Sequence, residues 1–350
     1  MCGIAGWLSA STPPDAAIVT RMREQLVHRG PDGAGTWLAP AEPGERGGAC
    51  LGHRRLAIVD LAAGAQPMVD GDLAVTFNGE IYNHDTLRAE LAVPFRTRSD
   101  TEVLLHGYRR WGIGLLPRLN GMFAFAIYDH ANRAALLARD RMGQKPLYYY
   151  LAGDQLIFAS ELKALLVHPL VEPRIDREAI ALYLSHEYVP APHSAIAGVK
   201  KLSAGDYLAW RDGKAAVATF ARPAFSPPAT PRSAWPEELA EHLERSVARR
   251  LMADVPLGVF LSGGIDSSTI VAWLCQLRPA ASVKTFAIGF EDASFDESAH
   301  ARRVAQHFGT EHHEATLSAD TMLAALPRVA AMLDEPFADA SLLPTTLLSQ

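Results

Sequence analysis

The chain has 350 residues, more than the roughly 100–200 of a single domain, so its length favours two domains. Hydrophobic residues make up 49% and charged residues 21% of it, which excludes a disordered, collagen-like or coiled-coil protein. A net charge of −6, with both signs mixed along the sequence, gives no basic footprint for nucleic acid or an anionic membrane, so we expect a small-molecule substrate.

Short apolar runs separated by Gly, Asn and Asp characterise the first two hundred residues. This pattern predicts an antiparallel, sheet-dominated domain. Expected strands include residues 74–77, 123–128 and 147–151. A proline-rich stretch at 219–235 suits neither a helix nor a central strand, and we interpret it as a linker. The first domain is therefore placed at residues 1–218.

Strands and helices alternate in the second predicted domain, residues 236–350. Pro236 opens an expected helix whose apolar residues recur at every fourth position, at Leu239, Leu243, Val247 and Leu251. The elements that follow are a strand at 259–261, a turn at 262–268, a buried helix at 270–277, a strand at 285–290, a helix at 296–308 and a strand at 312–317. The alternation predicts a parallel, doubly wound sheet.

Cys2 becomes the first residue if Met1 is removed. It then carries a thiol and an α-amine with a pKa of about 8 on one residue, so nucleophile and base are adjacent. Neither Cys50 nor Cys275 forms a C-x-x-C pair, which argues against a disulfide framework or a structural zinc site. A cysteine beside the initiator is more often without function, so this prediction depends on the motifs that follow it.

Five motifs follow in order along the first domain. They are M-C-G-I-A-G (1–6), H-R-G-P-D (28–32), H-R-R-L-A-I-V-D (53–60), N-G-E-I-Y-N (78–83) and S-D-T-E (99–102). Together with residues 121–129 and 140–148, they resemble the glutaminase domain of class II glutamine amidotransferases, over about Cys2 to Tyr207. The resemblance implies an α+β N-terminal-nucleophile fold, an αββα sandwich, that hydrolyses glutamine at Cys2.

Hydrolysis of an amide passes through a tetrahedral oxyanion, which needs preorganised donors about 3 Å away. Asn78 offers a side-chain N–H, and Gly79 offers a backbone N–H that no Cβ shields. An Asn-Gly pair on its own more often marks a hairpin turn. With Cys2 present, we interpret Asn78 and Gly79 as an oxyanion hole.

Free glutamine must also be held by its α-carboxylate and its α-ammonium group, which call for a guanidinium and carboxylates. By similarity to the family, Arg55 pairs with the α-carboxylate and Asp100 with the α-ammonium group. The same resemblance places Glu80 at the polar end of the ligand and adds Val59 and Asn78 to the glutamine-binding residues.

The heptapeptide S-G-G-I-D-S-S (262–268) lies between an expected strand and an expected helix, where backbone N–H groups and the helix dipole create an anion site. It lacks the features of Walker A and dinucleotide loops and resembles the pyrophosphate loop of ATP pyrophosphatases. The alternatives are a plain glycine-rich turn and, for Asp266, a helix N-cap. Asp266 is also the candidate Mg²⁺ ligand. The implied ATP-binding residues are Leu261, Ser262, Gly263, Gly264, Asp266, Ser267, Ser268 and Ile288.

A glutaminase of this type joined to this loop resembles glutamine-hydrolysing asparagine synthetase, with further matches at 255–261, 285–290, 295–297 and 334–339. The resemblance implies an ATP-dependent ligase. Its second domain, an α/β parallel-sheet domain of the adenine-nucleotide α-hydrolase type, converts aspartate to a β-aspartyl-adenylate that ammonia attacks. Family members continue to another motif past the position of Gln350, so we expect a fragment with an incomplete synthetase domain.

The acceptor is the least defined part of this interpretation, since amidation of another carboxylate, in a surface glycan or a secondary metabolite, stays open. A glutamine-binding or scaffolding protein on a decayed fold is disfavoured by the complete set of site residues. The expected partners are glutamine, aspartate and ATP, without nucleic acid or membrane, and a homodimer is left open. No apolar run of roughly 18 residues and no secretory leader is present, which predicts a cytoplasmic protein. The histidines His28, His53 and His84 match no metal-ligand spacing and are interpreted as structural.

Overall fold

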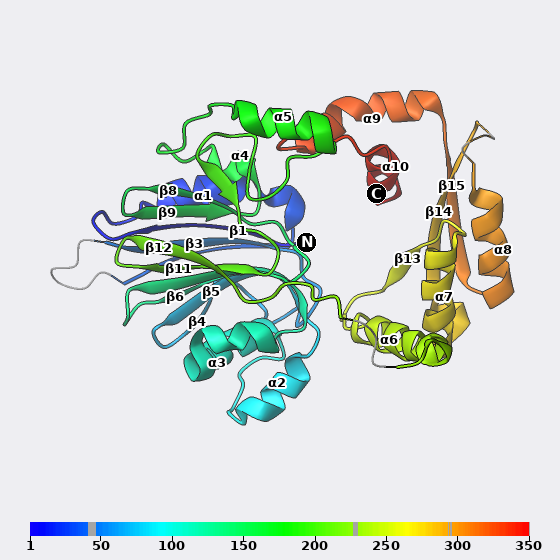
Figure 1. Cartoon of the computed structure of the whole chain (residues 1–350), viewed down its shortest axis with the longest axis horizontal. Helices are drawn as coiled ribbons and strands as arrows, with labels where there is room; N and C mark the ends of the chain where they lie inside the picture. Colours follow the sequence, from blue (N-terminus) through cyan, green and yellow to red (C-terminus); the bar gives the residue numbers. More distant parts are fainter. Residues whose placement is uncertain (41–46, 227–229, 293, 295, 350) are drawn as a thin grey trace. The chain divides into compact units, whose positions relative to one another are not determined.

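The structure is a computed structural model that describes residues 1–40, 47–226, 230–292, 294 and 296–349. It divides into two compact units, which we treat separately (Figure 1). The first comprises Met1–Ala224 and Asp334–Phe337, and the second comprises Phe225–Leu333 and Ala338–Gln350. The division after Ala224 falls inside the stretch interpreted as a linker, of which residues 227–229 lie outside the described part.

Two six-stranded antiparallel sheets form the centre of the first unit (Figure 1). In spatial order, the first sheet contains β10 (Val199–Lys201), β8 (Tyr148–Ala152), β9 (Gln155–Ala159), β1 (Gly3–Ser9), β3 (Gly48–Arg55) and β2 (Gly33–Leu38). The second contains β12 (Lys214–Thr219), β11 (Asp206–Arg211), β7 (Ala134–Arg139), β6 (Gly121–Asp129), β5 (Leu73–Ile81) and β4 (Met68–Asp70). The runs predicted at 74–77 and 123–128 lie within β5 and β6, and the run at 147–151 overlaps β8 except for Leu147. The antiparallel prediction is confirmed.

Helices cover the outer faces of the two sheets. The cluster between the sheets includes Ile4 from β1 and Trp210 from β11, so the sheets pack face to face. Outside the first sheet, α1 (Ala16–Glu24) and α4 (Leu162–Leu165) bury their apolar residues against β1 and β9. Outside the second, α2 (His84–Leu91) and α3 (Thr101–Trp111) pack on β5 and β6. The predicted αββα sandwich is confirmed. The remaining helical segments of this unit are η1 (Val27–Arg29), η2 (Gly112–Arg118) and α5 (Arg177–His186).

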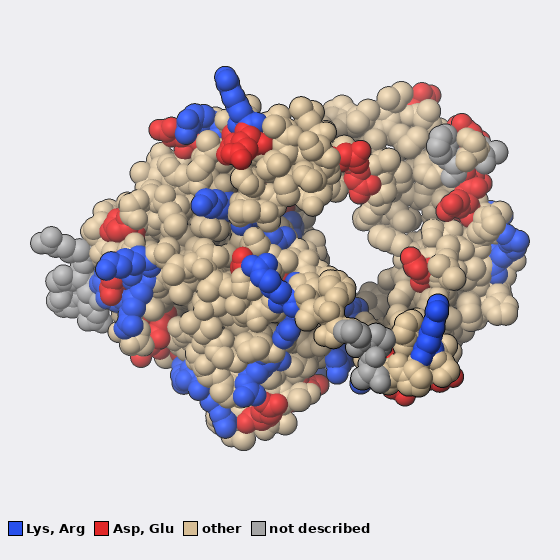
Figure 2. Space-filling view, in the orientation of Figure 1, with Lys and Arg blue, Asp and Glu red and all other residues tan. Residues whose placement is uncertain are grey.

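The inner strands are apolar on both faces because both faces are covered. In β1, Ile4 and Leu8 point into the cluster between the sheets, whereas Ala5 and Trp7 pack under α1 and α4. Side chains alternate between the faces of a strand, so a strand with two covered faces appears as a continuous apolar run. Outside the core, basic and acidic side chains are interspersed over the face of this unit seen in Figure 2.

A three-stranded parallel sheet forms the centre of the second unit, which confirms the parallel arrangement. Its strands β13 (Gly258–Phe260), β14 (Lys284–Phe290) and β15 (Glu311–Leu317) lie in chain order, and the described strands include no reversal that makes a sheet doubly wound. The helices are α6 (Trp235–Arg249), α7 (Ile265–Leu277), α8 (Ser298–Phe308), α9 (Ala319–Met332) and α10 (Leu342–Leu348), with short turns η3 (Arg232–Ala234) and η4 (Ala280–Ser282).

Two expectations about the helices of the second unit are wrong. The first helix ends at Arg249 instead of Leu251, and Leu239 on its apolar face is 59% exposed. Within the helix expected to be buried, Val271 alone is fully buried. The buried cluster of this unit is small, with Leu261, Val271, Ala287, Ala301 and Ala305. The described residues therefore supply too few apolar layers to cover these helices on every side.

The short segment Asp334–Phe337 groups with the first unit, although the chain on both sides of it belongs to the second. The Asp334 carboxylate lies 3.2 Å from the Lys163 ammonium group. The Glu335 carboxylate pairs with Lys201 and accepts a hydrogen bond from the Tyr148 hydroxyl at 3.2 Å. These ionic contacts and the hydrogen bond account for the grouping of the segment with the first unit.

Candidate active site

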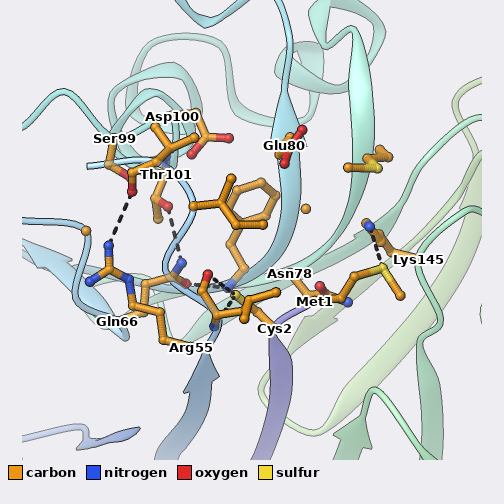
Figure 3. Close-up of a pocket in the computed structure, with 17 residues that line it drawn as sticks. Met1, Cys2, Arg55, Gln66, Asn78, Glu80, Ser99, Asp100, Thr101 and Lys145 are labelled. Atoms are coloured by element: carbon orange, nitrogen blue, oxygen red, sulfur yellow. Dashed lines mark hydrogen bonds between the residues drawn. The ribbon is translucent and has the colours of Figure 1, made fainter. Parts of the chain in front are cut away.

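A pocket of about 80 Å³ in the first unit brings together all seven residues predicted for glutamine hydrolysis (Figure 3). They come from the residue before β1, the end of β3 and the loop after it, β5, and the residue before α3. The predicted members are Cys2, Arg55, Val59, Asn78, Gly79, Glu80 and Asp100, and further lining residues include Met1, Gln66, Ser99, Thr101 and Lys145.

Cys2 is held at its thiol by the Leu56 backbone and at its carbonyl oxygen by the Arg29 side chain. Its Sγ lies 3.4 Å from the Leu56 backbone nitrogen, and its carbonyl oxygen accepts a hydrogen bond from Arg29 Nε at 3.0 Å. Burial raises the pKa of the Cys2 thiol, and the hydrogen bond to the Leu56 backbone lowers it in part. The thiol is therefore positioned but not activated while Met1 blocks the Cys2 amine.

Asn78 carries an amide that the protein itself leaves unused. The residue lies within β5 and is 1% exposed, yet neither its Nδ2 nor its Oδ1 has a hydrogen-bond partner among the described residues. A buried amide without partners is costly, by about 1–3 kcal/mol, unless a ligand completes it. The amide lines the pocket beside Cys2, which makes it a preformed donor for a ligand atom there.

The backbone N–H of Gly79 points toward the same pocket by the alternation of the strand. The N–H groups of Phe77 and Ile81, two residues to either side, donate to Gln66 Oε1 at 2.7 Å and Asp100 Oδ2 at 2.8 Å. Alternate residues of an antiparallel strand direct their N–H groups to the same side, so the Gly79 N–H lies between them and faces the pocket. A Cβ at Gly79 would also meet the Met122 carbonyl oxygen at 2.1 Å, so only glycine fits. Both residues lie inside β5, so the hairpin-turn alternative is wrong.

Asp100 is a buried carboxyl with few stabilising contacts. It is 4% exposed, and burial raises its pKa to about 7, against the lowering effect of the Ile81 N–H. The charge of Glu80, which also lines the pocket, raises the pKa further. A ligand cation placed here would favour the ionised form. The two carboxylates therefore form an acidic end of the pocket.

Arg55 closes another side of the pocket and organises the loop after β3. Its guanidinium donates to the backbone carbonyls of Val59 at 3.2 Å, Asp60 at 2.6 Å and Leu61 at 3.0 Å. A guanidinium has five N–H donors, so two stay outside these bonds and can bind a carboxylate. Val59 contributes to the pocket wall and to the anchoring of Arg55.

The pyrophosphate-loop motif lies in the second unit between β13 and α7, as its pattern predicts. A cavity of about 390 Å³ is lined by four of the predicted nucleotide-binding residues, Leu261, Ser262, Ser267 and Ile288. The remaining four, Gly263, Gly264, Asp266 and Ser268, are not part of its lining. Gly263 has a φ of +80°, and a Cβ there would meet the Ala301 backbone nitrogen at 2.5 Å, so the tight loop requires glycine.

Asp266 does not cap the helix that follows the loop. The N-cap of α7 is Gly264, without a side-chain hydrogen bond, and Asp266 lies exposed in the first turn. The N-cap alternative is therefore wrong, because the helix already begins at Ile265, one residue before Asp266. The carboxylate is accessible to a ligand, and its place in the first turn suits the helix dipole.

Comparison with known proteins identifies both halves of the chain. Residues 1–221 match the family model described as a glutamine amidotransferase domain, and residues 238–350 match that of asparagine synthase. The putative asparagine synthetase [glutamine-hydrolyzing] 2 of Methanocaldococcus jannaschii is 33% identical over the whole chain, which covers 71% of that protein. The chain belongs to the glutamine-hydrolysing asparagine synthetase family.

Bacterial members of the asparagine synthetase family are similarly close. Asparagine synthetase [glutamine-hydrolyzing] 1 of Bacillus subtilis is 38% identical over 98% of this chain and 54% of its own length. Asparagine synthetase B of Escherichia coli is 37% identical over 90% of this chain and 54% of its own length. The chain thus spans about half the length of these curated relatives.

Several residues of this asparagine synthetase family site were not singled out from the sequence. Ser99, Thr101 and Lys145 line the pocket, and each lies within a stretch that carried the resemblance. Arg29, which bonds to the Cys2 carbonyl, could also have been recognised from its place in the H-R-G-P-D motif. Gln66 lies in no motif, and its amide links the Phe77 N–H to the Thr101 hydroxyl only in the folded chain.

The three histidines interpreted above as structural, His28, His53 and His84, have partners within the protein. His28 Nε2 lies 2.9 Å from a Glu161 oxygen, and His84 Nδ1 lies 3.1 Å from the Ile81 carbonyl oxygen. Burial lowers the pKa of His53 to about 3, so this histidine is neutral, and its Nδ1 lies 3.2 Å from the Thr76 hydroxyl. Across the described residues, no group of three or more His, Cys, Asp or Glu side chains could hold a metal ion.

None of the described helices is long and apolar enough to span a membrane.

Proposed function

We propose that the protein is a glutamine-dependent asparagine synthetase. Glutamine is hydrolysed to glutamate and ammonia in the first unit. ATP and aspartate give a β-aspartyl-adenylate and pyrophosphate in the synthetase domain, and ammonia attacks the adenylate to give asparagine and AMP. The observation that supports the glutaminase half is the buried Asn78 amide, which lines the pocket of Cys2 and has no hydrogen-bond partner in the described part of the chain.

Catalysis by the glutaminase unit begins with removal of Met1. The freed Cys2 amine accepts the proton of Sγ, and the thiolate attacks the side-chain amide carbon of glutamine. As the C–S bond forms, the carbonyl electron pair moves to oxygen, where the Asn78 Nδ2–H and the Gly79 N–H stabilise it. The Cys2 ammonium group then protonates the leaving nitrogen, the C–N bond breaks, and ammonia departs.

A γ-glutamyl thioester at Cys2 is left after the departure of ammonia. Water, deprotonated by the same amine, attacks this thioester, the C–S bond breaks, and glutamate is released as Sγ recovers a proton. Arg55 and the carboxylates of Asp100 and Glu80 bind the α-carboxylate and α-ammonium group of the substrate, remote from the reacting carbon. Binding and chemistry are thereby assigned to different residues.

Glutamine binding should weaken as the pH falls below about 7. The raised pKa of Asp100 means that this carboxyl is protonated and neutral below pH 7 in the free site, and a neutral carboxyl cannot pair with the α-ammonium group. The KM for glutamine should therefore rise about tenfold per pH unit below pH 7 and stay flat above it. Steady-state KM against pH is the measurement. Asp100→Asn should raise KM at every pH and remove this dependence, and a wild-type KM that is independent of pH would contradict the assignment.

The proposed nucleotide half uses the loop between β13 and α7. Ser262 and Ser267, whose hydroxyl oxygens lie 3.0 Å apart, and the N-terminal N–H groups of α7 offer donors for a pyrophosphate. Mg²⁺ prefers several oxygen ligands, and one accessible carboxylate beside phosphate oxygens and water fits that preference. Asp266 would hold the ion there, and the ion would supply charge neutralisation for the leaving pyrophosphate.

Asp266→Asn should impair synthesis and leave glutaminase turnover within about twofold of wild type, because the loop and Cys2 lie in different units. The assay is performed on the full-length protein with aspartate, ATP, Mg²⁺ and ammonia, and the products are followed by ³¹P NMR. AMP and pyrophosphate are the expected products, because the loop has no Walker lysine to assist γ-phosphoryl transfer. Release of ADP and phosphate would contradict the proposed function.

Aspartate is the proposed acceptor because the relatives cited above are named asparagine synthetases. The alternative of another carboxylate acceptor is not favoured by any of these similarities. The cytoplasmic location and the homodimer stay predictions from the sequence.

A further inference from the structure

Lys145 places a positive charge in the glutaminase pocket without an ordinary partner. The residue is 4% exposed and lines the pocket with Cys2 and Asn78. Its ammonium group lies 2.7 Å from the Met1 thioether sulfur, and Figure 3 shows it pointing at Met1 beside Cys2. A thioether is a weak acceptor, and among the described residues this ammonium group donates no other hydrogen bond.

The contact with Met1 ends if Met1 is removed. A buried ammonium group that loses even this acceptor is expensive, and such groups concentrate at functional sites. Removal of Met1 creates a new α-amine at Cys2, which lines the same pocket as Lys145. The charge of Lys145 then lies in one pocket with the group that the proposed mechanism uses as its base.

The charges around this part of the pocket determine which of the two amines keeps its proton. Burial lowers the pKa of Lys145, whereas Glu80, Asp140 and the Cys2 thiol raise it and Arg29 lowers it. In the chain that retains Met1, burial lowers the pKa of the N-terminal amine, Arg29 and Lys145 lower it further, and the Cys2 thiol and Asp32 raise it. An ordinary lysine has a pKa of about 10.4 and an α-amine one of about 8, so the α-amine gives up its proton first.

We propose, on the basis of the proposed glutaminase function, that Lys145 is a positioning residue whose ammonium group holds the α-amine of Cys2 in its neutral, proton-accepting form. Two like charges in one pocket disfavour each other, so a protonated Lys145 disfavours protonation of the amine. If the pKa of the amine falls by one unit from about 8, the fraction of amine that is neutral at pH 7 rises from roughly one tenth to one half. Lys145 thereby makes Cys2 reactive at neutral pH without a histidine.

The test compares Lys145→Met, which removes the charge, with Lys145→Arg, which keeps it, in full-length protein shown by intact mass to begin at Cys2. The measured quantity is kcat for glutamine hydrolysis against pH at saturating glutamine, where the bound α-ammonium group keeps Asp100 ionised. In Lys145→Met, the acidic limb of the pH profile of kcat should lie about one pH unit higher, and kcat at pH 7 should be about fivefold lower. At high pH the kcat of Lys145→Met should equal that of the wild type. Lys145→Arg should keep the wild-type pH profile. Lys214→Met, an exposed lysine on β12, is the matched control.

A purely structural role would lower kcat of Lys145→Met by the same factor at every pH, and that result, or an unchanged limb, would overturn the inference. If Lys145→Met does not fold, Lys145→Gln replaces it. A second measurement is independent of turnover: the rate of acylation of the α-amine against pH, read by mass spectrometry in Cys2→Ser backgrounds. The amine should titrate about one unit higher without the Lys145 charge. An inactive wild type would refute the proposed function, whereas this titration would still decide the role of Lys145.

Discussion

Cys2→Ala should abolish glutamine hydrolysis, by about four orders of magnitude or more in kcat, and leave ammonia-dependent asparagine synthesis by the full-length protein intact. The reason is that the proposed nucleophile, Cys2, lies in the first unit, whereas the proposed nucleotide loop lies in the second and does not use the thiol. The measurements are glutamate release and asparagine formation with glutamine or ammonia as nitrogen source.

The matched control for this variant is Cys50→Ala. Cys50 is fully buried, and burial raises its thiol pKa to about 12, so it cannot act as a nucleophile near neutral pH. The control should lose stability through a small cavity and keep glutaminase activity once folded. Glutaminase activity in Cys2→Ala protein that is free of contaminating enzyme would refute the role of Cys2.

Asn78→Ala should lower kcat for glutamine hydrolysis about 10²–10³-fold, equivalent to about 3–4 kcal/mol, with little change in KM. The Asn78 amide has no hydrogen-bond partner among the described residues, and in the proposed mechanism its donor acts on charge that develops in the transition state. Because the amide makes no hydrogen bond to any described residue, its loss should not destabilise the fold through an unpaired neighbour.

Asn83→Ala is the matched control within the same N-G-E-I-Y-N motif. The Asn83 amide donates to the Arg118 carbonyl and accepts from the Asn120 N–H, so its loss should lower the unfolding temperature with less effect on kcat. Arg55→Ala should instead raise KM, because the proposed partner of Arg55 is the α-carboxylate at the remote end of glutamine. If Asn78→Ala changed KM alone, the oxyanion-hole assignment would be wrong.

Most residues of the pocket around Cys2 could be predicted from the sequence, because they lie within short motifs whose order is itself informative. Cys2, Asn78 and Asp100 come from three different segments, yet the structure brings them to one pocket. The motif could not show that the Gly79 N–H faces the ligand site, since that depends on the strand position shared with Phe77 and Ile81. Gln66 was missed because its role exists only through tertiary hydrogen bonds.

The second unit was less predictable for physical reasons. Periodicity correctly placed β14, an apolar run, and α8, an amphipathic helix that Gly309 ends in the left-handed region. The alternation of elements placed β15, although most of its residues are polar. The apolar residues of α7 were expected to be buried, but burial requires a second layer on each face, and sequence periodicity does not show whether that layer is present. The helix start at Ile265, which rules out the cap at Asp266, was likewise beyond pattern analysis.

The most direct test of the account is to trap the covalent intermediate at Cys2. The protein is mixed with glutamine, quenched in acid within the first turnover, and digested, and its N-terminal peptide is analysed by mass spectrometry. The account predicts a peptide that begins at Cys2 without Met1 and carries a γ-glutamyl thioester on Sγ, absent from Cys2→Ala. An active protein whose N-terminal peptide retains Met1, or in which the glutamyl group is attached to another residue, would contradict it.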